Sequence, residues 1–162
     1  MNEHKLIILG PQCSGKTTLK KYLQEKDPSL PLIDEDELFM ELNGGEYPQD
    51  IEYKEKTLRP KLENKVRQAE NMIFLTSYCN PELLKELKSK GFKVIQLVLE
   101  MDEFQRRNDR RMKEQGYADA NTWAKEAFSF HKEVRDAGLV DKEIDTTLPI
   151  KEIVRQVLET YY

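Results

Sequence analysis

The sequence predicts an α/β fold in which helices cover both faces of a parallel sheet. Short apolar runs alternate with amphipathic segments along all 162 residues. The run Leu6–Leu9 is continuously apolar, which is typical of a central parallel strand buried on both faces. The last segment, from Ile150 to Tyr161, carries one apolar helical stripe. Because parallel strands are joined by right-handed crossovers, this alternation predicts one three-layer domain over residues 1–162.

Each element follows from its local pattern. The second strand contains Pro31, which favours an edge position because proline lacks an N–H group. Residues 50–71 have a helical pattern interrupted by Pro60, so we expect a kink or two helices there. The expected strands are 4–9, 30–33, 72–75, 92–99 and 143–145. Helices are expected at 16–26, 37–42, 50–71, 80–90, 120–137 and from 147 or 149 onward.

The segment Gly10–Thr17 matches the pattern G-x-x-x-x-G-K-[ST] at every fixed position, between a strand and a helix. Gly10 and Gly15 allow backbone torsions that turn successive N–H groups towards phosphate oxygens. A helix that begins near Lys16 adds its unpaired N–H groups and positive dipole end. Lys16 would contact the β- and γ-phosphates, and the Thr17 hydroxyl would ligate Mg²⁺. The alternative is a glycine-rich turn that binds nothing.

The predicted site for ATP and Mg²⁺ includes most of this loop and the start of the helix. Its members are Gly10, Gln12, Cys13, Ser14, Gly15, Lys16, Thr17 and Thr18.

Composition restricts the class of protein. Charged residues make up 35 % and apolar residues 38 % of the chain, and the formal charge is −4. This balance suits a cytoplasmic protein and makes nucleic acid a less favoured partner than a small molecule. We find no apolar run long enough for a membrane span and no signal peptide in Met1–Lys5. Cys13 and Cys79 are not spaced as a disulfide framework or metal pair, and the sequence leaves monomer and homodimer open.

Three acidic residues, Asp34, Glu35 and Asp36, follow the second strand directly. Ligands of open α/β sheets collect at the carboxyl ends of the strands, so this position favours a functional role. A carboxylate there could accept the proton of an alcohol that attacks a phosphoryl group. The alternative is an acidic N-cap for the helix that begins near Glu37.

A second polar segment, residues 101–113, contains four arginines. Arg106 and Arg110 share one helix face, and Arg107 and Arg111 share another, so two guanidinium groups could reach one triphosphate. The alternative is surface ion pairing, because Asp102 and Glu103 lie four residues before Arg106 and Arg107. We expect Arg106 and Arg110 to contact phosphate and Arg107 to be structural.

With these motifs in order, the chain resembles P-loop kinases of the nucleoside-monophosphate-kinase-like group, which includes adenylate, shikimate, gluconate and polynucleotide kinases. The resemblance spans nearly the whole chain. It implies a P-loop NTPase fold with strand order 2-3-1-4-5, a substrate-binding insert at about 35–70 and a lid at about 106–120.

The resemblance also implies residue roles. Asp34 looks like the first acid of the D-x-D sequence of shikimate-kinase-like members, so it would contact Mg²⁺ or its water, or act as base. Asp36 would bind the acceptor hydroxyl, and Arg59 looks like the family's substrate-clamping arginine. Asp145 and Thr146 resemble the loop beside the adenine edge. Arg59 as a solvated helix charge and residues 145–146 as a helix cap are the alternatives.

The sequence departs from the family at the end of the third strand. Residues 75–79 contain no carboxylate and no glycine run, which counts against shikimate as the substrate. Mg²⁺ would then be bound by Thr17, phosphate oxygens, water and Asp34. His4 and His131 are too isolated for a metal site and are expected at the surface, and Trp123 is expected to pack beneath the lid.

The function that we expect is an ATP-dependent kinase acting on a small hydroxyl- or phosphate-bearing metabolite of the nucleotide, nucleoside or sugar-acid class. The catalytic residues would be Lys16, Asp34, Asp36, Arg106 and Arg110. One alternative is a polynucleotide 5′-hydroxyl kinase. Another is a nucleotide-dependent switch or regulatory ATP-binding protein with slow turnover.

Overall fold

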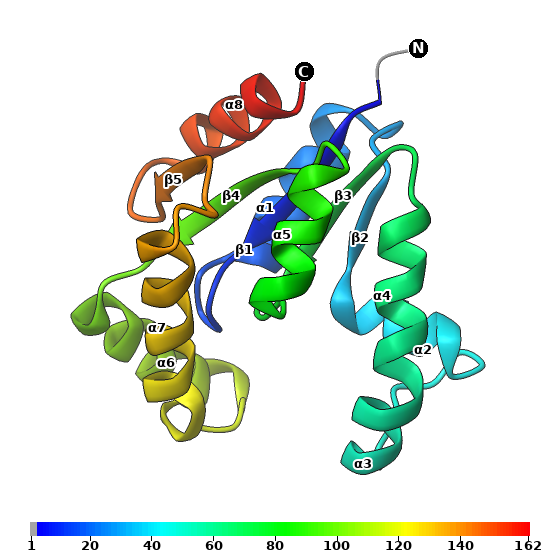
Figure 1. The fold of residues 1–162 in the computed structure, drawn as a ribbon. Helices are drawn as coiled ribbons and strands as arrows, with labels where there is room; N and C mark the ends of the chain where they lie inside the picture. Colours follow the sequence, from blue (N-terminus) through cyan, green and yellow to red (C-terminus); the bar gives the residue numbers. More distant parts are fainter. Residues whose placement is uncertain (1–2) are drawn as a thin grey trace.

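A computed structural model describes residues 3–162 and contains one five-stranded sheet (Figure 1). The strands are β1 (Lys5–Leu9), β2 (Leu32–Asp34), β3 (Met72–Thr76), β4 (Lys93–Val98) and β5 (Lys142–Asp145). They are all parallel, in the order β2-β3-β1-β4-β5. The structure therefore confirms the predicted fold class and strand order. It also confirms the edge position of β2, where the Pro31 carbonyl accepts a hydrogen bond from Ile73.

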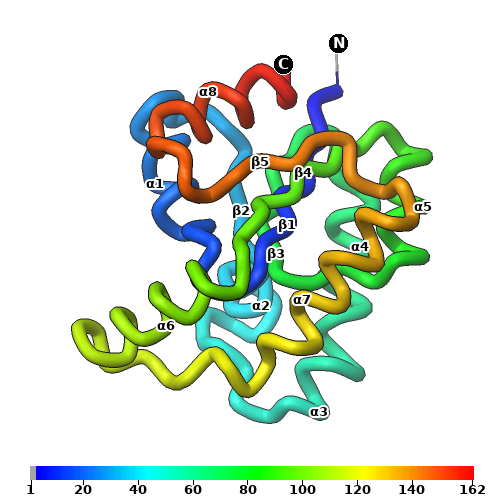
Figure 2. The backbone as a smooth tube through the Cα atoms, turned by 90° about the vertical axis from the view of Figure 1, so that its left-hand side faces the viewer, coloured from blue at the N-terminus to red at the C-terminus, as the bar shows by residue number. Residues whose placement is uncertain are grey.

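Helices cover both faces of the sheet, as Figure 2 shows from the side. One face carries α1 (Lys16–Lys26) and α8 (Ile150–Tyr161), and the other carries α4 (Arg59–Gln68), α5 (Pro81–Ser89) and α7 (Asn121–Asp136). Side chains of a strand alternate between the faces. In β1, Leu6 and Ile8 pack under α1 and α8, while Ile7 and Leu9 pack towards α4, α5 and α7. Residues 6–9 of the central strand are thus fully buried, as their continuous apolar sequence predicts.

The region between β2 and β3 is helical, with a widened turn just before Pro60. It contains α2 (Glu35–Leu42), α3 (Ile51–Tyr53) and the π-helical turn η1 (Lys54–Leu58), which leads into α4. Proline has no N–H group and its ring clashes with the carbonyl four residues earlier. A π turn lengthens the hydrogen-bonding step and accommodates this defect. The interruption expected at Pro60 is therefore a π turn within a continuous helical path.

The carboxyl ends of the strands form one edge of the sheet, where the predicted site residues gather. β1 ends at the loop 10–15, and β2 ends at Asp34. Figure 1 shows α2 and α6 (Met101–Gln115) at this end of the sheet, on opposite sides. The edge is thus flanked by the acidic α2 and the arginine-rich α6. Within residues 3–162, no helix is long and apolar enough to span a bilayer.

Substitution of Ile8 tests whether β1 is a buried central strand. Its side chain is fully buried, so Ile8→Ala should lower the free energy of unfolding by about 2–5 kcal/mol through lost burial and a residual cavity. Ile51 is 71 % exposed, and Ile51→Ala should change the free energy by less than about 0.5 kcal/mol. Urea denaturation of both variants at pH 7 measures the difference. Equal effects of the two substitutions would contradict the assignment of β1 to the core.

Candidate functional site

Residues 10–15 form a tight turn that connects β1 to α1. The Gly10 N–H donates to the Thr76 carbonyl at 3.2 Å, and a Cβ atom added at Gly10 would lie 2.4 Å from Ser14 Oγ. Cys13 and Gly15 have left-handed backbones, with φ of 66° and 87°. Gly15 is the N-cap of α1, and no side chain caps this helix. Because uncapped helix N-termini bind anions through their N–H groups and dipole, the turn has the geometry of a phosphate site.

Lys16 lies across the loop. Its Nζ donates to the carbonyl of Gly10 at 2.6 Å and to that of Pro11 at 3.0 Å. Burial lowers the pKa of Lys16 to about 8, although the negative charges of Glu35 and Asp36 partly oppose this shift. No carboxylate among residues 3–162 forms an ion pair with Lys16. The ammonium group therefore has neutral partners at the loop, and a phosphate oxygen would be its first anionic one.

The other residues predicted to contact nucleotide lie around this loop. Gln12, Thr17 and Thr18 are exposed, and Ser14 is buried. The Asp145 carboxylate accepts hydrogen bonds from the amide and the hydroxyl of Thr147, at 2.8 and 2.7 Å. This side chain is thus held in the turn before α8, but it does not cap the helix, because the N-cap of α8 is Pro149 and has no side-chain hydrogen bond.

The arginines of α6 divide into two pairs with different surroundings. Arg107 donates to the Cys13 carbonyl at 3.0 Å and to the Thr146 carbonyl at 2.9 Å, which joins the phosphate loop to the β5–α8 turn. Arg111 Nη1 lies 3.1 Å from Cys13 Sγ. Arg106 is exposed and pairs with Glu103, and Arg110 is exposed without an ion pair among the described residues.

The structure thus brings Arg107 and Arg111 to the loop and leaves the predicted pair Arg106 and Arg110 in solvent. Sequence spacing showed that each pair shares a helix face, but it could not decide which face is turned inward. Arg107 was expected to be structural, and it bridges two backbone segments and pairs with Glu103. Arg111 is a loop contact that the sequence spacing did not reveal.

Asp34 is the N-cap of α2. Its Oδ1 accepts from the Glu37 amide at 2.8 Å, and Glu37 reaches back to the Asp34 amide, which completes a capping box. Its Oδ2 lies 3.1 Å from Lys20 Nζ. The capping alternative is therefore realised at Asp34. Its role towards Mg²⁺ or as a base stays a prediction.

Asp36 differs from Asp34 because it has no ion pair or hydrogen bond to another described side chain. Loss of surrounding water raises the pKa of Asp36, and the nearby charge of Asp34 raises it further. The positive charges of Lys54 and Lys16 oppose this shift, so both cations lie near Asp36. Asp36 is thus the carboxylate at this edge that remains available to a ligand.

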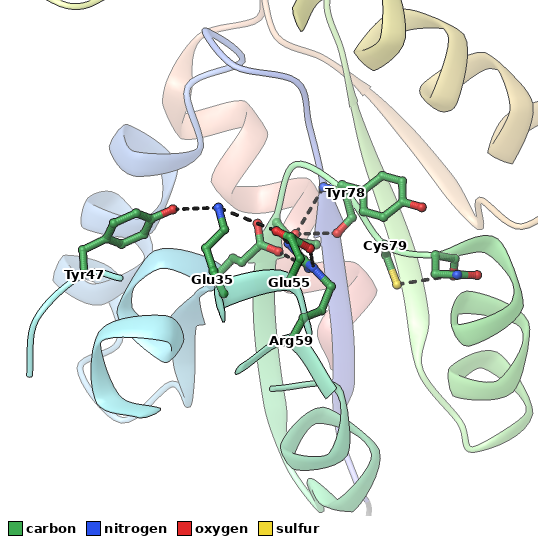
Figure 3. A network of polar contacts seen from close by, with 9 residues as sticks. Glu35, Tyr47, Glu55, Arg59, Tyr78 and Cys79 are labelled. Atoms are coloured by element: carbon green, nitrogen blue, oxygen red, sulfur yellow. Dashed lines mark hydrogen bonds and ion pairs between the residues drawn. The ribbon is translucent and has the colours of Figure 1, made fainter. Parts of the chain in front are cut away.

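Arg59 lies between two carboxylates (Figure 3). Its Nη1 donates to Glu35 at 2.8 Å, and its Nη2 donates to Glu55 at 3.1 Å, with a second contact from Nε to Glu55. Burial by itself lowers the pKa of Arg59, but the hydrogen bonds and charges of Glu55 and Glu35 outweigh burial and raise it. The predicted substrate clamp is therefore neutralised by partners from α2 and η1.

The end of β3 carries hydroxyl groups in place of a carboxylate. Thr76 Oγ1 donates to the Tyr78 carbonyl at 2.8 Å, which fixes the turn into α5. Residues 3–162 contain no group of three or more His, Cys, Asp or Glu side chains arranged to hold a metal ion. A cation at this edge would need ligands from the bound substrate and from water.

His131 was expected at the surface, and this prediction was wrong. The residue is 4 % exposed, because α7 packs on β4. Arg135 Nη1 donates to Gln96 Oε1 at 2.9 Å, so Gln96 Nε2 is the donor to His131 Nδ1 at 3.0 Å. The proton of His131 is then on Nε2, which has no partner among the described residues. Burial, with smaller effects of Lys16 and Arg135, lowers the pKa of His131 to about 4.

Two further features lie away from the edge. Trp123 was expected to pack beneath the lid, but it is 64 % exposed, and Phe104 and Phe128 fill that position instead. A groove of about 610 Å³ runs between α1 and α8, lined by residues such as Tyr22, Val154 and Leu158. None of the predicted site residues lines this groove, so it is not part of the site.

Comparison with known proteins supports the fold but no narrower assignment. No protein-family model matches this sequence, and no curated protein is similar to it in sequence. The chain is similar in structure to shikimate kinase from Aquifex aeolicus, with 21 % identity and a TM-score of 0.67, covering 96 % of this chain and 94 % of that one. Shikimate kinase from Bacteroides thetaiotaomicron gives 20 % identity and a TM-score of 0.68, with 96 % and 97 % covered.

A gluconokinase from Sinorhizobium meliloti is also similar, with 16 % identity, a TM-score of 0.62, and 98 % of this chain and 91 % of that one covered. At these identities the similarity shows the fold. The resemblance to P-loop kinases is therefore confirmed for the chain's architecture.

The buried ammonium group predicts how stability depends on pH. Lys16 has a pKa of about 8 in the folded protein, against an ordinary lysine value of 10.5. Between these values the unfolded chain binds the proton and the folded protein does not, so the free energy of unfolding rises with pH. For one group this rise is at most about 1.4 kcal/mol per pH unit. Urea denaturation at pH 7, 8, 9 and 10 should show that the free energy of unfolding of wild type, measured relative to that of Lys16→Met, rises with pH.

The control is Lys21→Met, since the Lys21 side chain is 73 % exposed on the same helix. This variant should keep the wild-type pH dependence. Parallel curves for wild type and Lys16→Met would mean that Lys16 is not desolvated.

Proposed function

We propose that this protein is a phosphotransferase that moves the γ-phosphoryl group of ATP to a hydroxyl or phosphate group of a small metabolite, of the nucleotide, nucleoside or sugar-acid class. One observation carries the proposal: an uncapped helix N-terminus with an ammonium group, Lys16, lies near an available carboxylate, Asp36, so that each group affects the pKa of the other. The fold shared with shikimate kinases and a gluconokinase supports the same reaction class. Phosphoryl transfer requires phosphate-binding and proton-accepting groups side by side, and both kinds lie at this edge.

At the nucleotide end, the loop amides and Lys16 would bind the β- and γ-phosphates. Arg111 would approach the same phosphates from α6, because its guanidinium already contacts Cys13 of the loop. The exposed Thr17 hydroxyl fits an Mg²⁺ ligand, and the phosphate oxygens and water would complete the set of hard oxygen donors. Mg²⁺ would neutralise negative charge on the phosphates. Asp34, which is held by Lys20 and by its capping role, would act on the metal through water.

At the acceptor end, Asp36 would accept the proton of the attacking hydroxyl. Its raised pKa makes it a stronger base than a fully solvated aspartate. The helices α2 to α4 would form the acceptor-binding insert, and residues 106–120 would act as a lid that excludes water from the transfer. We also propose a cytoplasmic location, with which the two free cysteines agree.

The test is an ADP-release assay with ATP and Mg²⁺ against nucleotides, nucleosides, sugars, sugar acids and 5′-hydroxyl oligonucleotides. We expect acceptor-dependent ADP release with a small molecule. Asp36→Asn should lower kcat by about 10²–10⁴-fold, since it removes the base. Lys16→Ala should lower kcat/KM by about 10²-fold or more, since it removes a charge on the transferring phosphoryl group.

Two matched variants control for charge and folding. Lys21→Ala changes an exposed lysine of α1, and Asp136→Asn changes an exposed aspartate at the end of α7. Both should retain wild-type rates. Transfer that survives Lys16→Ala and Asp36→Asn would refute the site. Transfer to oligonucleotides alone would indicate a polynucleotide kinase, and nucleotide binding without acceptor-dependent ADP release would indicate a switch.

A further inference from the structure

The acceptor side of the edge carries a strong negative charge. The stretch 34–59, which spans α2, α3, η1 and the first residue of α4, contains nine acidic and three basic side chains, a formal charge of −6. The whole chain has a charge of only −4. The remaining residues are thus slightly positive, and the acidic surplus is concentrated where the acceptor would bind.

The guanidinium group best placed to bind an acidic acceptor already has two carboxylate partners. Arg59 is bound by Glu35 and Glu55, and its side chain is 20 % exposed. The Glu35 side chain is 18 % exposed, so this pair is shielded from solvent salt. A carboxylate or phosphate on the acceptor would have to displace Glu35 or Glu55, and the displaced glutamate would remain close by without its partner.

The other cations near the acceptor also have partners. Lys20 contacts Asp34 and Glu37, and Lys54 lies 3.3 Å from the Tyr47 hydroxyl and 3.7 Å from Glu55. Lys54 also lies over the rings of Phe39 and Tyr47, at 5.6 Å from each centroid.

Arg67 of α4 contacts Glu86 and Glu63. Arg135 of α7 contacts Gln96 and lies 3.6 Å from Glu143. His131 is neutral because burial lowers its pKa to about 4. None of these cations is left without a partner for an acidic acceptor, whereas Asp36 is an available anion.

We infer that the acceptor of this kinase carries an ammonium group or no charge, such as an amino sugar or a nucleoside, and that Glu35 excludes acidic acceptors by neutralising Arg59. This inference rests on the proposed phosphotransferase activity. Among the proposed acceptor classes it favours nucleosides over nucleotides and sugar acids, and it adds amino sugars. A hydroxyl next to an ammonium group would place the cation near Asp36 and Glu55 and the reacting oxygen towards Lys16. The negative charges of Asp36 and Glu55 would repel an acidic acceptor. This repulsion would discriminate between acidic acceptors and neutral or cationic ones.

The experiment compares acceptors that share a carbon skeleton and differ in charge. Glucosamine, glucose and glucuronate form one set, and adenosine and AMP form another. ADP release with ATP and Mg²⁺ gives kcat/KM for each compound. Within the set that is phosphorylated, we expect the neutral or cationic member to exceed the acid by about tenfold or more in wild type.

Glu35→Gln removes the charge but keeps an oxygen that can accept from Arg59. This variant should raise kcat/KM for the acid by about tenfold relative to the neutral member, because Arg59 then has one carboxylate partner, Glu55, in place of two. The matched control is Glu41→Gln on the same helix, where Glu41 pairs with Lys65 away from Arg59. It makes the same change in net charge and should leave the ranking of acceptors as in wild type.

Each outcome separates the acceptor inference from the kinase proposal. A wild-type preference for glucuronate or AMP would overturn the inference and leave the kinase proposal standing, and this ranking needs no variant that could misfold. Equal shifts in Glu35→Gln and Glu41→Gln would overturn the role of Glu35. If wild type binds ATP but no compound, including those of the wider metabolite panel, stimulates ADP release, the kinase proposal fails and the inference fails with it.

Discussion

The backbone of the turn between β1 and α1 is the constraint on which the rest of the site depends. The left-handed conformations of Cys13 and Gly15 reverse the chain within a few residues, and Gly10 has no room for a side chain. A non-glycine residue in this conformation costs about 1–2 kcal/mol, so the surrounding structure must hold Cys13 in place. Arg107 does so by donating to its carbonyl. As a result, the N-terminus of α1 lies at the carboxyl edge of the sheet, and no side chain caps it.

The two sides of this edge have opposite electrostatic character. On the side of α6, arginines contact the phosphate loop directly and could meet a polyanion. On the side of α2 and η1, acids outnumber bases, and Arg59 is held between Glu35 and Glu55. Lys16 and Asp36 lie where the two sides meet, and each affects the pKa of the other. Under the proposed function, such a polarity would place a triphosphate and an acceptor of different charge on separate sides of one edge of the sheet.

A polar network of one cation and two uncharged side chains supports the sheet behind this edge. Hydrogen bonds among Gln96, His131 and Arg135 join α7 to β4. The bond from Arg135 fixes the amide orientation of Gln96, and Gln96 in turn fixes the tautomer of His131. Because His131 stays uncharged in the neutral pH range, it places no additional charge next to Lys16. The Nε2 atom of His131 carries the proton, in the tautomer that Gln96 imposes.

The sequence by itself determined the fold class, the strand order through the family resemblance, and the position of the phosphate loop. These features rest on local patterns: a continuously apolar strand, fixed glycine spacing and helical stripes. Only the tertiary structure decided which charged groups meet. Arg59 and Glu35 are 24 residues apart, and Arg107 and Cys13 are 94 residues apart, so neither contact leaves a local signal.

The spacing of Arg106, Arg107, Arg110 and Arg111 defined two possible faces, and the packing of Phe104 against Phe128 turned one of them inward. Burial of His131 likewise depends on α7 lying across Gln96 of a distant strand. Long polar side chains pair with the groups that lie near them in space. Which groups lie near them depends on how the sheet and helices pack together.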